Sequence, residues 1–323
     1  MTKKLYNSKI IASGSYLPTK ILTNADLEKM VDTTDDWITT RTGIKKRHIA
    51  EKNELTSDLG FNAAKKALEK SGLKAKDIDA IILATTTPDL TFPATATKIQ
   101  AKLGAVNAFA FDVQAVCSGF VYALNVADNF IKTGQAKNIV VIGAETLSRI
   151  VDWQDRNTCV LFGDGAGAVV LSRSEDESSG ILATKISSDG TLNDILKTSG
   201  GTSFSQNAGL IEMQGKEVFK HAVEKMSGSV IATLEKAGLT IADIDLLVPH
   251  QANLRILAGV AKKLNLSDDK VMVTVPDHAN TSAASIPLAL DIALQENKIK
   301  KGDIVVFEAL GGGLTWGSVV VRW

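Results

Sequence analysis

A twelve-residue run that occurs twice constrains the fold of this chain more than any other feature. LEKSGLKAKDID (68–79) returns as LEKAGLTIADID (234–245), with eight of the twelve positions identical at an offset of 166 residues. Each copy passes a glycine, Gly72 or Gly238, that signals the end of a helix, and then enters an apolar stretch typical of a buried strand. Two amphipathic helices can resemble each other by chance, but an ancestral duplication accounts better for the pair.

Apolar segments later in the chain repeat in the same order. KNIVVIGAE (137–145) corresponds to GDIVVFEAL (302–310), and FGDGAGAVVL (162–171) corresponds to GGGLTWGSVVV (311–321). Strands that alternate with helices favour α/β layers in which helices cover both faces of each sheet. The duplication therefore extends through the chain.

We predict two similar α/β halves, residues 1–175 and 176–323, joined by the polar segment SRSEDESSG (172–180). Within them, a strand should end at FDV (111–113), and helices should cover 117–133 and 280–298, the second with Asn280 at its N-cap.

Composition indicates an ordinary globular protein. Lys plus Arg and Asp plus Glu are equal at 36 each, so no overall field attracts nucleic acid or an anionic membrane. No apolar run approaches the ~18 residues of a transmembrane helix, and the N-terminal segment lacks the features of a signal peptide. Two cysteines, Cys117 and Cys159, are too few for a disulfide framework and lack metal-ligand spacing. We expect a reduced, cytoplasmic protein without a bound metal.

Cys117 is the candidate nucleophile. It lies between a predicted strand and a predicted helix in DVQAVCSGF (112–120), and the small Ser118 and Gly119 follow it. The N-terminal end of a helix favours a thiolate and can lower a cysteine pKa. A buried structural cysteine is the alternative for Cys117, and it is the preferred interpretation of Cys159.

His250 and Asn280 are the candidates to complete the site. His250 follows the second-half strand in LLVPHQANLRI (246–256), at the strand end where α/β sheets build their sites. Asn280 precedes the small residues of HANTSAAS (278–285). These patterns alone do not establish that the two side chains meet Cys117.

Taken together, the motifs resemble the thiolase superfamily of condensing enzymes, and within it the β-ketoacyl-acyl carrier protein synthase III family. The resemblance covers essentially the whole chain. The segments that show it are VDTTDDWITTRTGI (31–44), TTTPDLTFPATA (85–96), DVQAVCSGF (112–120), FGDGAGAVVL (162–171), VPHQANLRI (248–256), HANTSAAS (278–285) and EALGGGLTWGS (308–318).

The resemblance implies a five-layered α/β/α/β/α fold made of two duplicated halves, and a homodimer. It implies that Cys117 is acylated by acyl-CoA, and that His250 and Asn280 act in decarboxylative condensation with malonyl-acyl carrier protein. The backbone N–H groups of Cys117 and Gly312 would form the oxyanion hole. Coenzyme A is then part of a substrate, and no cofactor or metal is expected.

Substrate contacts are also implied by the family. Trp37 and Arg156 would hold the adenine of coenzyme A, with Thr33 and Arg41 nearby. Asn253 and Phe219 would line the pantetheine tunnel, where Lys216 departs from the asparagine of many relatives.

Further contacts involve other proteins. Phe92 would close the acyl pocket of the partner subunit and favour a short group such as acetyl. Lys220, Arg255, Lys262 and Lys263 would form the basic patch for the carrier protein, although they could equally form a solvated helix face.

Other functions stay open on the sequence. The chain could be a related condensing enzyme of secondary metabolism, which would differ in its second substrate. It could also be a hydrolytic cysteine enzyme, or a non-catalytic paralogue that binds acyl-CoA or carrier protein. The presence of Cys117, His250 and Asn280 together disfavours the last alternative.

Overall fold

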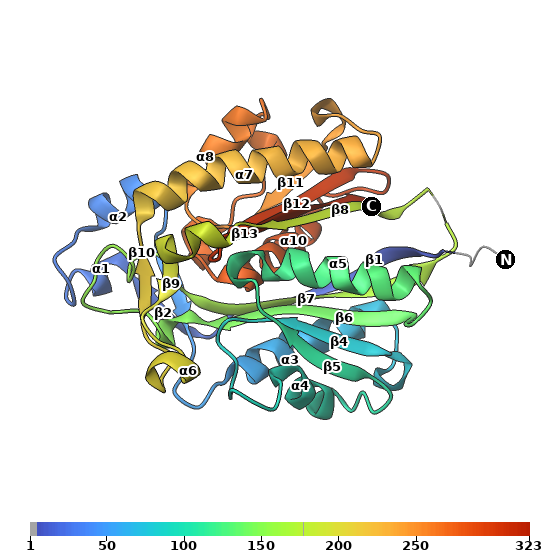
Figure 1. The fold of residues 1–323 in the computed structure, drawn as a ribbon, viewed down its shortest axis with the longest axis horizontal. Helices are drawn as coiled ribbons and strands as arrows, with labels where there is room; N and C mark the ends of the chain where they lie inside the picture. The colour runs from blue at the N-terminus through green and yellow to red at the C-terminus, as the bar shows by residue number, and fades with distance from the viewer. Residues whose placement is uncertain (1–4, 177) are drawn as a thin grey trace.

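Two mixed β-sheets form the framework of the protein. The computed structural model describes residues 5–176 and 178–323. The first sheet has the strand order β1-β7-β6-β4-β5, and the second has the order β11-β12-β13-β8 (Figure 1). Their strands are β1 Asn7–Tyr16, β4 Ala80–Ala84, β5 Phe109–Val113, β6 Asn138–Thr146, β7 Asp164–Ser174, β8 Gly180–Ser188, β11 Leu246–Pro249, β12 Ile304–Gly311 and β13 Thr315–Arg322.

Helices form three layers around the sheets, so the predicted five-layered arrangement is confirmed (Figure 1). Helices α3 and α4 cover the outer face of the first sheet, α5 and α10 lie between the sheets, and α7 and α8 cover the second sheet. These helices are α3 Thr56–Ser71, α4 Thr95–Leu103, α5 Gly119–Lys132, α7 Gly215–Lys236, α8 Leu254–Lys263 and α10 Ser285–Gln295.

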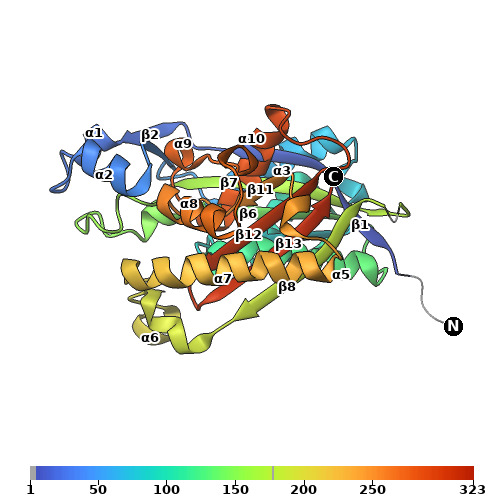
Figure 2. The same cartoon turned by 90° about the horizontal axis from the view of Figure 1, so that it is seen from above.

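Additional short strands and helices lie outside the two main sheets, and several of them lie together beyond one end of the sheets (Figure 2). They are the strands β2 Lys20–Thr23, β3 Lys46–Ile49, β9 Leu196–Thr198 and β10 Ile211–Met213, and the helices α1 Asn24–Leu27, α2 Asp35–Thr42, α6 Thr202–Ser205 and α9 Val275–His278. Two 3₁₀ helices, η2 Val116–Ser118 and η7 Ser282–Ala284, precede α5 and α10.

Strand pairing repeats between the halves. In the first sheet β4 is parallel to β6, which is antiparallel to β7. In the second sheet β11 is parallel to β12, which is antiparallel to β13. Strand β5 has a reduced counterpart, because at the equivalent place Val271 forms only an isolated parallel bridge with Leu247. The repeated run identified in the sequence thus ends α3 and α7 and leads into β4 and β11.

Three sequence predictions about boundaries need correction. The proposed connector is shorter, because residues 172–174 belong to β7 and Gly180 begins β8. The predicted helix over 280–298 begins only at Ser285 and ends at Gln295. Asn280 is therefore not a helix N-cap. Small residues after it, Ser282 to Ala284, form a 3₁₀ turn instead of α-helix.

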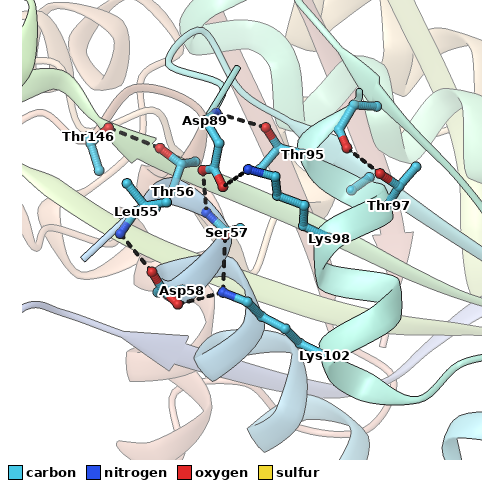
Figure 3. Close-up of polar contacts among 12 residues, drawn as sticks. Leu55, Thr56, Ser57, Asp58, Asp89, Thr95, Thr97, Lys98, Lys102 and Thr146 are labelled. Carbon is cyan, nitrogen blue, oxygen red and sulfur yellow. Dashed lines mark hydrogen bonds and ion pairs between the residues drawn. The ribbon is translucent and has the colours of Figure 1, made fainter. Parts of the chain in front are cut away.

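A polar network fixes the loop between β4 and α4 (Figure 3). The buried Asp89 carboxylate accepts hydrogen bonds from the Ser57 N–H (2.9 Å) and the Lys98 ammonium (3.1 Å). The Thr56 hydroxyl donates to the Thr87 carbonyl oxygen (2.6 Å) and contacts the Thr146 hydroxyl (2.9 Å). The start of α3 thus holds this loop against the end of β6.

Among the described residues, no helix is both long and apolar enough to cross a membrane.

The buried carboxyl of Glu308, on β12, should make the stability of the protein depend on pH. Neither of its carboxyl oxygens has a hydrogen-bond partner among the described residues, and burial raises the pKa of Glu308 from 4.5 to about 8. Folding thus favours the protonated form. The contribution of Glu308 to stability is complete below pH 4.5 and is lost as the pH rises to about 8. The expected loss is about 1.4 kcal/mol per pH unit within that window.

In chemical unfolding across this window, wild type should therefore lose stability relative to Glu308→Gln, which cannot ionise. If the free energy of unfolding changed with pH equally in both proteins, Glu308 would not have the raised pKa described above.

Candidate functional site

Residues from both halves line one cavity of about 930 Å³. Cys117 comes from the first half, and His250, Asn280 and Gly312 come from the second. The three side chains that the sequence could not connect are therefore brought to a common chamber. The outer part of the same cavity is lined by Trp37, Arg41, Lys216, Phe219, Asn253 and Arg255.

Cys117 occupies a tight turn between β5 and α5. It lies in the 3₁₀ helix η2, and the preceding Val116 has a φ of +48°. The side chain of Ser118 donates to the Ala115 carbonyl oxygen (2.7 Å) and so closes the turn. Because Val116 takes a left-handed conformation that β-branched residues rarely adopt, the turn stores strain beside the sulfur.

Burial opposes the stabilisation of a Cys117 thiolate that the helix start favours. Cys117 is 5% exposed, and burial raises the pKa of its thiol to about 12 despite the start of α5 behind it. The nearby Glu145 carboxyl also raises this pKa, whereas the Ser282 hydroxyl lowers it. Burial disfavours the charged form of a thiol more than the helix end favours it.

The glycine loop after β12 closes over Cys117. A Cβ atom on Gly311 would lie 2.7 Å from the Cys117 nitrogen and 2.8 Å from the Ala115 carbonyl oxygen, so a side chain does not fit here. The Thr315 hydroxyl bonds to the carbonyl oxygens of Ala115 (3.0 Å) and Gly312 (3.1 Å). It thereby ties the two halves together at the nucleophile.

His250 is held as a neutral ring. Its Nδ1 lies 2.7 Å from the Ser285 hydroxyl, whose oxygen also accepts from the Gln251 N–H (3.2 Å). Burial lowers the pKa of His250 to about 3. With Ser285 donating to Nδ1, the assigned tautomer has its proton on Nε2. The ring then offers a neutral N–H donor to the cavity.

Asn280 is anchored on the first half. Its N–H donates to the Leu161 carbonyl oxygen (2.9 Å), and its own carbonyl oxygen accepts from the Gly163 N–H (3.0 Å). Its side-chain Oδ1 accepts from the Ser282 N–H (2.9 Å). That bond fixes the amide orientation and leaves the Nδ2 group to donate to a molecule in the cavity.

At the outer end of the cavity, two guanidinium groups lie close to the Trp37 ring. The Arg41 and Arg156 guanidinium carbons lie 4.5 and 5.2 Å from its ring centroid. Arg156 also pairs with Asp32 at 3.4 Å and does not line the cavity itself. Thr33 lies outside the lining too, and its buried hydroxyl has no hydrogen-bond partner among the described residues.

Two other predicted contacts stand at the mouth of the cavity. Phe219 lies on α7 beneath the Arg255 guanidinium, 5.7 Å from its ring centroid. Asn253 caps α8, and its Oδ1 accepts from the Ile256 N–H (3.0 Å). Lys216 is exposed at the same rim and places a positive charge there.

The remaining predicted residues lie outside the cavity. Phe92 is 81% exposed on the loop before α4. Lys220, Lys262 and Lys263 are exposed on α7 and α8, and Lys263 forms an ion pair with Glu224. Cys159 is fully buried in a hydrophobic cluster with Phe162.

Sequence reasoning missed Ser285 and Thr315, which position His250 and the glycine loop. Both lie within segments already noted, but single hydroxyl residues give no pattern that marks their partners.

Comparison with known proteins identifies the family. The N-terminal and C-terminal models of 3-oxoacyl-[acyl-carrier-protein] synthase III match residues 111–190 and 234–323. Beta-ketoacyl-[acyl-carrier-protein] synthase III of Ehrlichia canis is 58% identical over 98% of this chain and 99% of its own length. The chain belongs to the β-ketoacyl-acyl carrier protein synthase III family.

Solved structures of synthase III proteins agree. The enzyme from Aquifex aeolicus VF5 superposes with a TM-score of 0.94 at 53% identity, covering 98% of this chain and all of the other. A priming β-ketosynthase of the R1128 polyketide pathway also reaches 0.94, at 33% identity over 99% of this chain and 98% of its own.

Gly311→Ala tests the approach of the glycine loop in this synthase III chain. The added methyl group should displace the Cys117 turn, lower stability by about 1–3 kcal/mol and slow labelling of Cys117. Thermal unfolding and thiol labelling measure both effects. Gly228→Ala is the matched control, because a Cβ there meets no atom within 4 Å. Unchanged labelling in Gly311→Ala would contradict the described packing.

Proposed function

We propose that this protein transfers an acyl group from acyl-CoA to Cys117 and condenses it with malonyl-acyl carrier protein. The products would be a β-ketoacyl-acyl carrier protein, carbon dioxide and free coenzyme A, and the step would initiate type II fatty acid synthesis. The observation that supports this most is the single cavity that combines a buried thiol with two neutral donors, His250 and Asn280. In this proposal the reaction uses no cofactor.

The first half-reaction is acyl transfer. Cys117 attacks the thioester carbonyl, and the resulting oxyanion accepts hydrogen bonds from the backbone N–H groups of Cys117 and Gly312. Each donor of this kind is worth about 3 kcal/mol of barrier. The lack of a side chain at Gly311 supports this assignment, because it lets the glycine loop reach the Cys117 nitrogen.

The second half-reaction is decarboxylative condensation. Loss of carbon dioxide from the malonyl group leaves an enolate whose oxygen takes hydrogen bonds from His250 Nε2–H and Asn280 Nδ2–H. A neutral histidine suits this role because its lowered pKa keeps it uncharged near neutrality. The carbanion then attacks the acyl-Cys117 carbonyl, and the Cys117 sulfur leaves.

Substrate binding follows the length of the cavity. Trp37, Arg41 and Arg156 would hold the adenine through stacking and cation–π contact, after Arg156 moves aside to admit the base. Thr33 would contribute nearby, and Phe219 and Asn253 would flank the pantetheine arm. Lys220, Arg255, Lys262 and Lys263 would attract the acidic carrier protein, with Lys263 partly neutralised by Glu224.

A homodimer fits two features of the first half. Strand β5 is the last strand of its sheet, and Phe109 at its start is 43% exposed. An open edge strand of this kind invites pairing with another chain. Phe92 would then enter the acyl pocket of the partner subunit and restrict it to short groups, of which acetyl is the first candidate. We place this enzyme in the cytoplasm.

The main alternative function is that of a condensing enzyme of secondary metabolism. The structural similarity to the priming β-ketosynthase of a polyketide pathway supports this alternative. The identity of 58% with a synthase III against 33% with the priming enzyme favours fatty acid synthesis. A hydrolase would release free acid from acyl-CoA without a malonyl partner. A non-catalytic paralogue would bind acyl-CoA without transferring its acyl group.

Incubation with acetyl-CoA tests the acyl transfer. Wild type should gain one acetyl group by intact-mass measurement, and Cys117→Ala should gain none, because no other described cysteine reaches the cavity. Cys159→Ala is the matched control and should acetylate normally. Absence of an adduct on wild type with every short acyl-CoA would end the synthase assignment.

Asn280→Ala tests the second half-reaction. Acetylation of Cys117 should survive within a few-fold, whereas condensation with malonyl-acyl carrier protein should fall by about 10²–10³, the loss typical of one oxyanion donor. Single-turnover measurements separate the two steps. Equal loss in both half-reactions would contradict the role assigned to the amide.

A further inference from the structure

Lys225 is a mostly buried charged residue that the proposed mechanism does not use. It lies on α7, and its side chain is only 19% exposed. Its ammonium nitrogen lies 4.1 Å from the centroid of the Trp316 ring and 3.5 Å from Oδ2 of Asp189. Lysine is seldom buried unless its charge has partners, and these two residues are the partners here.

Both partners belong to the strands that frame the glycine loop, residues 311–314. Asp189 directly follows β8, and Trp316 is the second residue of β13. Helix α7 packs against both strands (Figure 2). Neither Lys225 nor its two partners line the cavity. The lysine therefore contacts the base of the glycine loop from outside the substrate cavity.

Asp189 holds the last residue of the loop through its backbone. Its N–H donates to the Leu314 carbonyl oxygen (2.8 Å), and the Leu314 N–H donates to the Asp189 carbonyl oxygen (2.9 Å). The Asp189 side chain is also fixed, because its Oδ1 accepts from the N–H (3.2 Å) and the hydroxyl (2.6 Å) of Thr191. The ion pair with Lys225 thus reaches a well-anchored residue.

Thr315 lies between the two positions that Lys225 supports. Leu314 precedes it and is paired with Asp189, whereas Trp316 follows it and carries the lysine on its ring. Tryptophan gives the strongest cation–π contact of the aromatic side chains. One ammonium group therefore restrains the chain on both sides of Thr315.

Thr315 transmits this restraint to the nucleophile. Its hydroxyl bonds to the carbonyl oxygens of Ala115 (3.0 Å) and Gly312 (3.1 Å), and the Ser118 hydroxyl lies 2.8 Å from it. Ala115 and Ser118 belong to the turn that contains Cys117. A shift of Thr315 would therefore change the position of Gly312 relative to the sulfur.

We propose that Lys225 is a positioning residue that holds the Gly312 N–H in the direction required by the oxyanion of the acylation step. The inference rests on the proposed acyl transfer, in which Gly312 is one of the two oxyanion donors. Lys225 does not touch the substrate and acts through Trp316 and Asp189. Such a donor lowers the barrier only when it is preorganised where the charge develops, and a displacement of about 1 Å can slow a reaction about 10²-fold.

Lys225→Met tests this role, because methionine keeps most of the side-chain stem and removes the charge. Single-turnover acylation of Cys117 at saturating acetyl-CoA should slow by about 10-fold or more. The acetyl-CoA concentration that gives half of the maximal rate should change by less than about 2-fold, because substrate contacts are unaffected. Lys225→Arg keeps a cation that can stack on the ring and should recover most of the rate.

Lys236→Met is the matched control. Lys236 is the last residue of α7 and also joins this helix to β8, since its ammonium group donates to the Thr184 carbonyl oxygen (3.2 Å). The control removes a comparable contact away from the glycine loop and should react like wild type. Thermal unfolding verifies that each variant is folded. Equal losses of rate in Lys225→Met and Lys236→Met would indicate general destabilisation and overturn the positioning role.

A double-mutant cycle tests whether Lys225 acts through the Trp316 ring. Trp316→Phe weakens the cation–π contact and should slow acylation in the same direction as Lys225→Met. The double variant should lose less rate than the product of the two single losses, because both changes disturb one contact. Independent, multiplicative losses would contradict the proposed coupling.

Hydrogen exchange reports on the loop without any substrate. The amides of residues 311–316 should exchange faster in Lys225→Met than in wild type, and at the wild-type rate in Lys236→Met, because exchange follows local opening. If acetyl-CoA does not modify wild type but exchange rises only in Lys225→Met, the support of the loop stands and the acyl transfer fails. If wild type and Lys225→Met are acylated at equal rates, the acyl transfer stands and the positioning role fails.

Discussion

The approach of the glycine loop to the Cys117 turn is the contact on which the rest of the site depends. Only a residue without a side chain fits at Gly311, where a Cβ would lie 2.7 Å from the Cys117 nitrogen. The Thr315 hydroxyl then bridges the two loops. Because one loop comes from each half, this contact joins the halves where the chemistry is proposed to occur. Both loops also line the cavity.

Burial, more than charge, sets the chemical state of the chamber. It raises the pKa of the Cys117 thiol and lowers that of His250, and so favours the uncharged form of both groups. In the proposed condensation, neutral donors such as His250 and Asn280 would donate hydrogen bonds to the short-lived enolate oxygen.

The sequence was sufficient to predict the layered architecture and the three main side chains, since repeats, buried-strand patterns and family motifs are all local signals. The reduced counterpart of β5 at Val271 was not predictable, because an isolated bridge leaves no periodic pattern. The burial of Cys117, which opposes the effect of the helix start on its pKa, was not predictable, because the helix start is visible in sequence and burial is not. Ser285 and Thr315 act through contacts between segments far apart in the chain, and no spacing reveals them.

Backbone strain gathers around the same chamber. Val116, Ala279 and Ser282 have φ values of +48°, +57° and +50°, and each lies within two residues of Cys117 or Asn280. Non-glycine residues in this region cost about 1–3 kcal/mol each, so the surrounding structure has to enforce them. It does so at Asn280 through backbone bonds to Leu161 and Gly163, and at Val116 through the packed glycine loop. These strained backbone conformations fix the directions of the Cys117 sulfur and the Asn280 amide. Glycine at Val116, Ala279 or Ser282 would adopt the same φ without strain, and it would also allow other conformations in which these groups lose their fixed directions.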